Sequence, residues 1–390
     1  MQETKRYISE RELEAVQSQL EYKTGELRVF VADIVPPDLE KREAMEDRMW
    51  ELENLVTTYG GVVILEHIQK RTLPDYNTYI WGGKLEEIMW EMQTQNANLL
   101  IVGNILKPRQ IHNLNEELKK IGAKAWDRVD LILKIFEKNA RSEETKLQIE
   151  LAAIKHMGPR IFDMGMELGK QAWKGSGESN TEIMKRHLAR RELEIRKDLE
   201  KYKRVREVHR LGRKKKWFLT IWIVGYTNAG KSSLMNFLTH KWVLAENKLF
   251  ATLWTSVGKM WLPERNSQEW VFSPGKEILF SDTIGFIRDL PPELVDAFAS
   301  TLEDSIESDI LFHVIDASDP KMPEKIQVVE EILSRIGAKQ QRYNIYNKID
   351  RLSEKYLKAL KKATKKQTVF YISTYTGEGI EILKEKLYDF

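Results

Sequence analysis

The sequence contains no cysteine, which excludes disulfide bonds, thiolate nucleophiles and zinc–cysteine sites. It also lacks long hydrophobic runs. The most apolar stretches, Trp217 to Val224 and Ile310 to Ile315, are far shorter than the ~20 residues that a membrane helix needs. The opening residues, MQETKRYISE, lack the apolar core of a secretion signal. We therefore expect a protein of the reducing cytoplasm with no membrane span.

Net charge is low as well, with 62 Lys and Arg residues against 59 Asp and Glu residues, a net of +3. The charge is unevenly distributed, because residues 183–216 contain 15 basic residues and only 5 acidic ones. Such a segment is typical of contact with a polyanion such as nucleic acid. A solvated helix with basic faces would have the same composition, so charge alone leaves the two interpretations about equal.

A length of 390 residues predicts two or three domains at roughly 150 residues each, and 42% hydrophobic residues argue against global disorder. We expect residues 1–24 to form a polar arm. From Leu27 onward, β-branched runs alternate with helical segments, as in LRVFVADIV, VVILEHI and NLLIVG. This alternation predicts a small parallel α/β domain over residues 25–129, which has no glycine-rich phosphate loop of its own.

Residues 130–216 have a helical pattern on both sides of a turn. We expect one helix from about Asp130 to Met157, a glycine-containing turn from Gly165 to Asn180, and a second helix from about Thr181 to Leu211 that carries the basic cluster. The helical hairpin would act as a lever or probe, or would be a spacer between domains.

At Trp217 the composition changes again. Buried-strand patterns such as WFLTIWIVG, EILFSD, ILFHVID, YNIYNK and TVFYIS follow, mostly separated by helical segments. They predict a doubly wound α/β domain with a mostly parallel sheet over residues 217–390. Since the chain stops soon after the last motif described below, we expect no further C-terminal domain.

The segment GYTNAGKS matches the phosphate-loop pattern G-x-x-x-x-G-K-[ST] and lies between a strand and a helix. Its backbone N–H groups would surround phosphates, Lys231 would neutralise them, and Ser232 would bind Mg²⁺. The expected contacts are Gly225, Tyr226, Thr227, Asn228, Ala229, Gly230, Lys231 and Ser232.

Three further motifs follow strands in the order of a guanine-nucleotide switch. DTIG (282–285) would hold Mg²⁺ through a water molecule bound to Asp282 and sense the γ-phosphate through the Gly285 N–H group. In NKID (347–350), Asp350 would accept two hydrogen bonds from guanine, which adenine cannot offer. Ser373 and Thr374 would lie near the guanine oxygen. The motifs therefore predict binding of GTP rather than ATP.

Hydrolysis is expected to depend on Lys231, Thr252, Gly285 and Asn228. Thr252, in KLFATLWTSVG, is our first choice for the Mg²⁺ ligand of the first switch, with Thr255 second. Phe286 stands where Ras-like switches have a water-orienting Gln, so we expect slow hydrolysis without a partner. Asn228 resembles the asparagine of potassium-stimulated GTPases, which makes K⁺ assistance a hypothesis.

Several longer segments carry a family resemblance. They are GYTNAGKSSLMN, LFATLW, DTIGFIRDLPPELVDAFASTLED and HVIDAS, and earlier in the chain PDYNTYIWGGKLEEI, RVDLILKIFEKNARSEETKLQIELA and GSGESNTE. Together they resemble the HflX branch of the Obg-HflX GTPases. The resemblance implies a cytoplasmic GTPase that binds the large ribosomal subunit and acts in ribosome dissociation and stress recovery. It also implies ribosomal RNA contact by the N-terminal domain and the helical hairpin.

By this resemblance the guanine-nucleotide contacts extend beyond the phosphate loop, and the Mg²⁺ ligands are Ser232 and Thr252. We expect a monomer. A GTP-gated ribosomal RNA-binding module with little turnover is the alternative function, and Phe286 and Trp254 favour it slightly. ATP-driven RNA remodelling ranks low, since there is no second phosphate loop. The further expected contacts are Phe250, Ala251, Thr252, Leu253, Trp254, Asp282, Thr283, Ile284, Gly285, Asn347, Lys348, Ile349, Asp350, Ser373, Thr374 and Tyr375.

Overall fold

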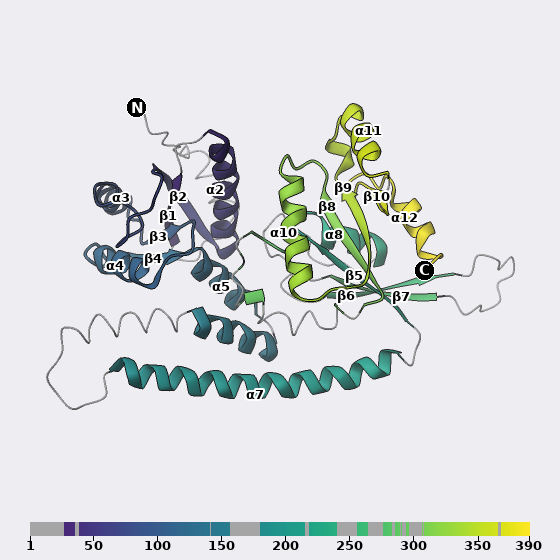
Figure 1. Ribbon diagram of the computed structural model, residues 1–390, viewed down its shortest axis with the longest axis horizontal. Coiled ribbons are helices and arrows are strands. Elements are labelled where there is room, and N and C mark those ends of the chain that lie inside the picture. The colour runs from purple at the N-terminus through teal and green to yellow at the C-terminus, as the bar shows by residue number, and fades with distance from the viewer. Residues whose placement is uncertain are drawn as a thin grey trace. The chain divides into compact units, whose positions relative to one another are not determined.

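A computed structural model of the chain divides it into two compact units, Met1–Lys197 and Asp198–Phe390 (Figure 1). Each unit has its own sheet, and the division falls within one helix, α7 (Asn180–Lys214). The structure describes residues 27–35, 39–140, 142–156, 180–214, 218–239, 256–263, 276–282, 285–288, 290, 294–295, 306, 308–365 and 368–390.

The first unit contains a four-stranded parallel sheet with strand order β2-β1-β3-β4. Residues 29–31 of β1 and 100–102 of β3 are fully buried, which explains why these strands read as nearly unbroken apolar runs. The predicted parallel α/β fold is thus confirmed. The elements are β1 (Leu27–Val35), α2 (Leu39–Tyr59), β2 (Gly61–Lys70), α3 (Gly82–Thr94), β3 (Leu99–Val102), α4 (Pro108–Lys119), β4 (Lys124–Asp127) and α5 (Arg128–Asn139).

Local signals set the ends of the helices in this unit. Pro108 occupies the first turn of α4, where its missing N–H group costs nothing. A capping box begins α5, because the Asp127 carboxylate accepts the Asp130 N–H bond and the Asp130 carboxylate accepts the Asp127 N–H bond.

The helical pattern predicted from Asp130 to Met157 is interrupted. Ala140 has an extended backbone at the end of α5, and a separate helix covers residues 143–156. Ser142 starts this helix, since its hydroxyl accepts the Thr145 N–H bond at 3.2 Å. The guanidinium of Arg191, on α7, forms two hydrogen bonds with Glu150 at 2.6 and 2.8 Å. The two arms of the predicted hairpin are therefore in contact.

The second unit contains a six-stranded sheet with order β10-β9-β8-β5-β7-β6. Only the edge strand β6 runs antiparallel within the described sheet, and the sequence did not predict it. The mostly parallel, doubly wound fold is confirmed. The elements are β5 (Leu219–Gly225), α8 (Lys231–Thr239), β6 (Ser256–Leu262), β7 (Lys276–Asp282), β8 (Ile310–Asp316), α10 (Met322–Arg335), β9 (Gln341–Asn347), a 3₁₀ turn (Ile349–Arg351), α11 (Glu354–Ala363), β10 (Val369–Tyr371) and α12 (Ile380–Leu387).

The core of the second unit lies around the central strands β5 and β8, where Ile221, Ile223, Phe312 and Val314 are fully buried. Since β5, β7, β8, β9 and β10 are parallel, their carboxyl ends lie at one edge of the sheet. The four predicted motifs follow strands at this edge. No helix within the described part of the chain is long and apolar enough to cross a membrane.

A buried ion pair provides a test of the first unit's core. Glu51 on α2 and Arg128 at the start of α5 pair with side-chain exposures of 3% and 1%. Replacing Glu51 with Ala should lower the free energy of unfolding by about 3–5 kcal/mol, because the Arg128 charge stays buried without this partner. Hydrogen exchange of the β1 and β3 amides would measure the loss. Glu86→Ala, on the exposed face of α3, should change it by less than about 0.5 kcal/mol. A loss as small in Glu51→Ala would contradict the role of the pair.

Candidate functional site: a phosphate loop at the edge of the second sheet

The phosphate loop connects β5 to α8, and glycine is required at both of its ends. A Cβ atom on Gly225 would lie 2.2 Å from the Val314 carbonyl oxygen, and one on Gly230 would lie 2.2 Å from Asn347 Nδ2. Gly230 also has a φ of 95°. These contacts explain the spacing of the two glycines, because only residues without a side chain let the loop pass so close to its neighbours.

Lys231, the first residue of α8, is 5% exposed, and its ammonium donates a hydrogen bond to the Tyr226 carbonyl at 2.8 Å. Burial lowers the pKa of Lys231 to about 8, while the negative charge of Asp282 acts in the opposite direction. A Cβ atom on Gly285 would lie 2.8 Å from Lys231 Nζ, so the DTIG motif reaches the phosphate loop. The Lys231 ammonium is thus buried and bonded to the Tyr226 carbonyl. A bound phosphate would take the place of that carbonyl as its partner.

Ser232 and Asp282 supply oxygen atoms beside this lysine. The Ser232 hydroxyl donates to Asp282 Oδ2 at 2.8 Å, and Asp282 is fully buried at the end of β7. A hydroxyl and a carboxylate are hard oxygen donors of the kind that Mg²⁺ prefers. These two residues therefore fit a magnesium ion next to the phosphates.

Phe286 is bonded to the phosphate loop through its backbone. Its N–H group donates to the Gly225 carbonyl at 3.1 Å, and its carbonyl accepts the Thr227 N–H bond at 2.8 Å. The residue is 4% exposed. The side chain is buried and apolar, so it has no means of orienting a water molecule.

The base-recognition motifs are already assembled. The Asn347 side chain donates to the Ala229 carbonyl at 2.9 Å and accepts the Thr374 N–H bond at 3.0 Å. The Ser373 hydroxyl donates to the Asp350 carboxylate. NKID therefore joins the phosphate loop to the residues after β10.

Asp316 is a site residue that the sequence analysis missed. Its carboxylate lies 2.6 Å from the ammonium of Lys348, which also donates to the Asn228 carbonyl at 2.7 Å. Asp316 thus holds Lys348 against the phosphate loop. The available signal was its position at the carboxyl end of the buried strand ILFHVID.

The structure brings together the described members of the predicted site, from Gly225 to Ser232, Asp282, Gly285, Asn347 to Asp350, and Ser373 to Tyr375. Several predicted residues lie outside the described part of the chain. They are Phe250, Ala251, Thr252, Leu253, Trp254, Thr255, Thr283 and Ile284.

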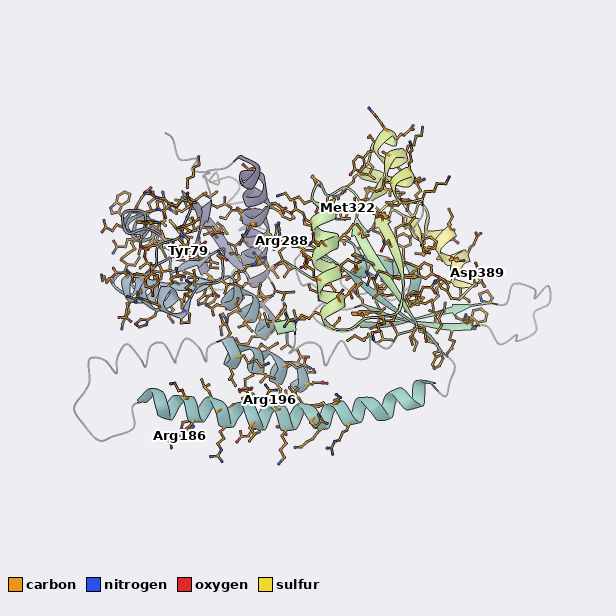
Figure 2. The ribbon with its side chains drawn as sticks, viewed as in Figure 1. Tyr79, Arg186, Arg196, Arg288, Met322 and Asp389 are labelled. Carbon is orange, nitrogen blue, oxygen red and sulfur yellow. The ribbon has the colours of Figure 1, made fainter. Side chains whose placement is uncertain are left out.

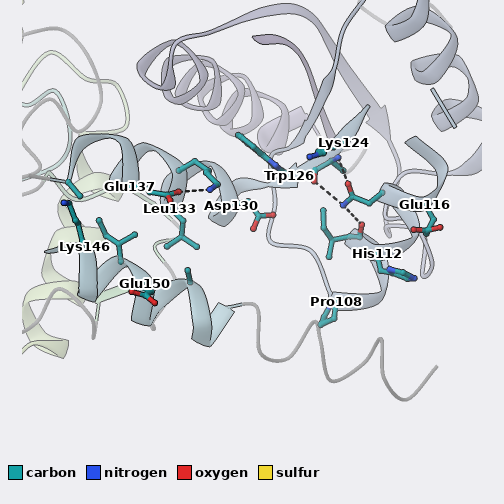
Figure 3. Close-up of a pocket in the computed structure, with 17 residues that line it drawn as sticks. Pro108, His112, Glu116, Lys124, Trp126, Asp130, Leu133, Glu137, Lys146 and Glu150 are labelled. Carbon is teal, nitrogen blue, oxygen red and sulfur yellow. Dashed lines mark hydrogen bonds and ion pairs between the residues drawn. The ribbon is translucent and has the colours of Figure 1, made fainter. Parts of the chain in front are cut away.

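The first unit has a cavity of about 860 Å³ between α4, β4, α5 and helix 143–156 (Figure 3). Its apolar lining includes Leu133 and Ile149. Asn115 covers the open edge of β4 there, since its side chain accepts the Ala125 N–H bond at 2.9 Å and donates to the Ala125 carbonyl at 3.3 Å. This pairing takes the place of a neighbouring strand.

His156 lies 3.6 Å from Asp127 and 3.5 Å from Asp130, an arrangement that sequence spacing did not predict. These three side chains are close enough to share a metal ion. Both carboxylates, however, already cap α5, so the contacts connect helix 143–156 to the start of that helix.

Comparison with known proteins extends the assignment beyond the phosphate loop. Three family models match, described as the N-terminal region of GTP-binding GTPases (residues 46–137), their middle region (139–213) and 50S ribosome-binding GTPases (220–348). The GTPase HflX of Caldanaerobacter subterraneus is 44% identical over 79% of this chain and 70% of its own length. The chain belongs to the HflX family of GTPases.

Two further comparisons agree. The GTPase HflX of Escherichia coli is 33% identical over 94% of this chain and 83% of its own length. A crystal structure of SsGBP with GDP matches over 93% of this chain and 98% of that one, with 29% identity and a TM-score of 0.51. The recognition and fold predicted from the sequence are therefore confirmed.

The low pKa of Lys231 predicts that GDP affinity depends on pH. Bound phosphate favours the charged ammonium, so affinity should be full below about pH 8 and should fall as pH rises above it, with proton uptake on binding near pH 8. Titration calorimetry between about pH 7 and 9, in buffers of different ionisation enthalpy, would measure both effects. In Lys231→Arg the guanidinium stays charged, so the pH trend should vanish. A flat profile for the unmodified protein would contradict the prediction.

Asp316→Asn tests the residue that the motifs missed. Losing the carboxylate charge should free Lys348 and weaken GDP binding about five-fold, which corresponds to about 1 kcal/mol for a pair of this partial exposure. Displacement of a fluorescent GDP analogue would give the affinity and the dissociation rate. Glu381→Gln removes an exposed carboxylate paired with Lys384 on α12 and should leave both values unchanged.

Proposed function

We propose that this member of the HflX family binds the large ribosomal subunit, hydrolyses GTP faster when bound, and acts in ribosome dissociation or rescue under stress. The observation that carries this proposal is the assembled guanine-nucleotide site within residues that match 50S ribosome-binding GTPases. We place the activity in the cytoplasm and assign it to a monomer.

In this proposal the phosphate loop and Lys231 bind the phosphates, and Asp350, Ser373 and Thr374 select guanine. Asn347 and Lys348 hold the base-recognition motif to the loop through the carbonyls of Ala229 and Asn228. Ser232 and Asp282 fit Mg²⁺, together with Thr252 of the first switch. When bound, the ion would neutralise negative charge that develops on the phosphates.

Hydrolysis also needs an oriented water molecule. Phe286 cannot orient it, because its side chain is apolar and buried and its backbone groups are bonded to the phosphate loop. The group that activates water must therefore come from elsewhere in the chain or from the partner. This requirement supports stimulation by the ribosome, with Asn228 as the residue through which K⁺ would assist.

Helix α7 is proposed as a ribosomal RNA contact. Arg186, Arg190 and Arg196 are exposed, and Figure 2 shows Arg186 and Arg196 extending from the helix. Arg190 and Arg196 pair with Glu194 and Glu192, but exposed pairs of this kind contribute only about 0–1 kcal/mol. The guanidinium groups can therefore exchange carboxylates for phosphates at little cost.

The alternative is a GTP-gated RNA-binding module with little turnover. The burial of Phe286 favours this alternative, because the apolar side chain at this position cannot orient a water molecule for hydrolysis. The two functions differ in one measurable quantity, the hydrolysis rate on the ribosome.

GTP hydrolysis should be measured with and without purified large ribosomal subunits, in K⁺ and in Na⁺ buffer. We expect strong stimulation by the subunit, and a higher rate in K⁺ if Asn228 has the assigned role. Arg186→Glu with Arg190→Glu should reduce stimulation and make subunit binding less salt-dependent, by about 0.7–0.9 in the log–log slope per lost phosphate contact. GDP affinity should stay unchanged.

Lys339→Glu with Lys355→Glu is the matched charge reversal on the second unit and should retain stimulation. Lys231→Ala should abolish nucleotide binding. GTP binding without any stimulation would favour the RNA-binding module and contradict the ribosome-coupled GTPase.

A further inference from the structure

The loop between β2 and α3 exposes two aromatic rings, each with an arginine beside it. Tyr76 is 66% exposed and Trp81 is 41% exposed. The guanidinium carbon of Arg109 lies 5.0 Å from the centre of the Tyr76 ring, and that of Arg71 lies 5.2 Å from the Trp81 ring. We call these four residues the arginine–aromatic platform.

The loop that carries the platform has a defined shape. The Asp75 N–H group donates to the Tyr79 carbonyl at 2.8 Å, and the Tyr79 N–H group donates to the Asp75 carbonyl at 3.2 Å. The Asp75 carboxylate also accepts hydrogen bonds from the N–H groups of Asn77 and Thr78, at 2.7 and 2.8 Å. The rings are thus held out to solvent by a closed turn, so little entropy is lost when a ligand stacks on them.

Contacts from two directions fix this turn to the rest of the unit. Toward the sheet, the Tyr79 hydroxyl donates to the buried carboxylate of Asp33 on β1 at 2.6 Å. Beside it, Gln110 on α4 donates to the Asp75 carbonyl at 2.7 Å, and Asn113 donates to the Asn77 carbonyl at 3.0 Å. The Trp81 indole N–H group donates to the Leu73 carbonyl at 3.3 Å, which sets the orientation of the ring.

The charge around the platform is positive. Lys70 and Lys107 are exposed close in sequence to Arg71 and Arg109, while Asp75, the acidic residue of the turn, is engaged in six hydrogen bonds through its backbone and carboxylate. Exposed rings that stand beside cationic groups fit stacked bases with adjoining phosphates. One face of each ring meets its guanidinium, and the exposed area remains available to a base.

We propose that the arginine–aromatic platform binds unpaired nucleotides of RNA by stacking bases on Tyr76 and Trp81, with Arg71 and Arg109 contacting the phosphates. This deepens the proposed function and rests on its RNA partner. It assigns a single-strand contact to the first unit that is separate from the basic helix α7.

Binding of a short fluorescein-labelled oligouridine to the full chain would test the proposal, with affinity read from fluorescence anisotropy. Tyr76→Ala and Trp81→Ala should each weaken binding about five-fold or more. Tyr76→Phe and Trp81→Phe keep a ring and should bind close to the unmodified protein. Trp90→Ala, which removes a 66% exposed ring from α3, is the matched control and should have no effect.

A second readout reports stacking itself. An oligouridine that contains 2-aminopurine should lose fluorescence on binding, and this quenching should disappear in the alanine variants and persist in the phenylalanine variants. Thermal melting checks the fold. If Trp81→Ala is destabilised through the lost Leu73 contact, Tyr76→Ala compared with Tyr76→Phe decides the matter, because Trp81→Phe also lacks the indole N–H group that bonds to the Leu73 carbonyl.

Unchanged affinity and quenching in the alanine variants would overturn the platform, as would absence of oligouridine binding or an equal loss in Trp90→Ala. Subunit-stimulated GTP hydrolysis, measured on the same variants, separates this outcome from failure of the proposed function. Stimulation that is retained while the oligonucleotide effects are absent rejects the platform alone. Ring-dependent oligonucleotide binding without stimulation by the subunit rejects the ribosome-coupled GTPase and leaves the platform in place.

Discussion

The nucleotide site depends on keeping a positive charge out of water before any phosphate arrives. Lys231 is buried, its ammonium is bonded to the Tyr226 carbonyl, and burial lowers its pKa to about 8. Dehydration makes the charged form unfavourable, so the folded protein is strained electrostatically at neutral pH. A bound phosphate relieves that strain, and part of the affinity for nucleotide therefore comes from a cost already present in the free protein. Gly285 is suited to its place beside this lysine, because a Cβ atom there would lie 2.8 Å from the Lys231 ammonium.

The same principle of assembly in advance holds for base recognition. Asn347 and Lys348 are bonded to the carbonyls of Ala229 and Asn228, so NKID and the phosphate loop form one hydrogen-bonded unit. Asp316 completes it by holding the Lys348 ammonium. A ligand without phosphates would lose the contacts of the phosphate loop, and one with the wrong base would lose those of NKID. Because the two parts are bonded to each other, neither can move to make up for the loss. Selectivity thus follows from the rigidity of the scaffold as much as from the contacts themselves.

How much of this was predictable from the sequence depends on the range of each interaction. Parallel strands buried on both faces and glycines at fixed spacing are local signals, and they predicted both sheets and the residues that the fold places together at the edge of the second one. Strand β6 was missed because SVGKMWL alternates weakly and pairs with β7 across the stretch from 263 to 275. The break at Ala140 was missed because residues 137–146 contain no glycine or proline to mark the end of a helix. Asp316 meets Lys348 from 32 residues away, and Asn115 meets Ala125 across a helix-to-strand turn. Only the fold brings such pairs together.

The position of Phe286 connects the geometry of the site with the proposed need for a partner. In a switch with a water-orienting Gln, the residue after D-x-x-G must be free to move its side chain toward the γ-phosphate. Here its N–H group and carbonyl are both bonded to the phosphate loop, and its ring is buried. These bonds stabilise the loop in a shape that binds phosphates, and they also remove the residue from the chemistry. Under the proposed function, a site built this way would bind nucleotide and hydrolyse it slowly until another group orients the water. Coupling of hydrolysis to a partner would then follow from how the loop is held.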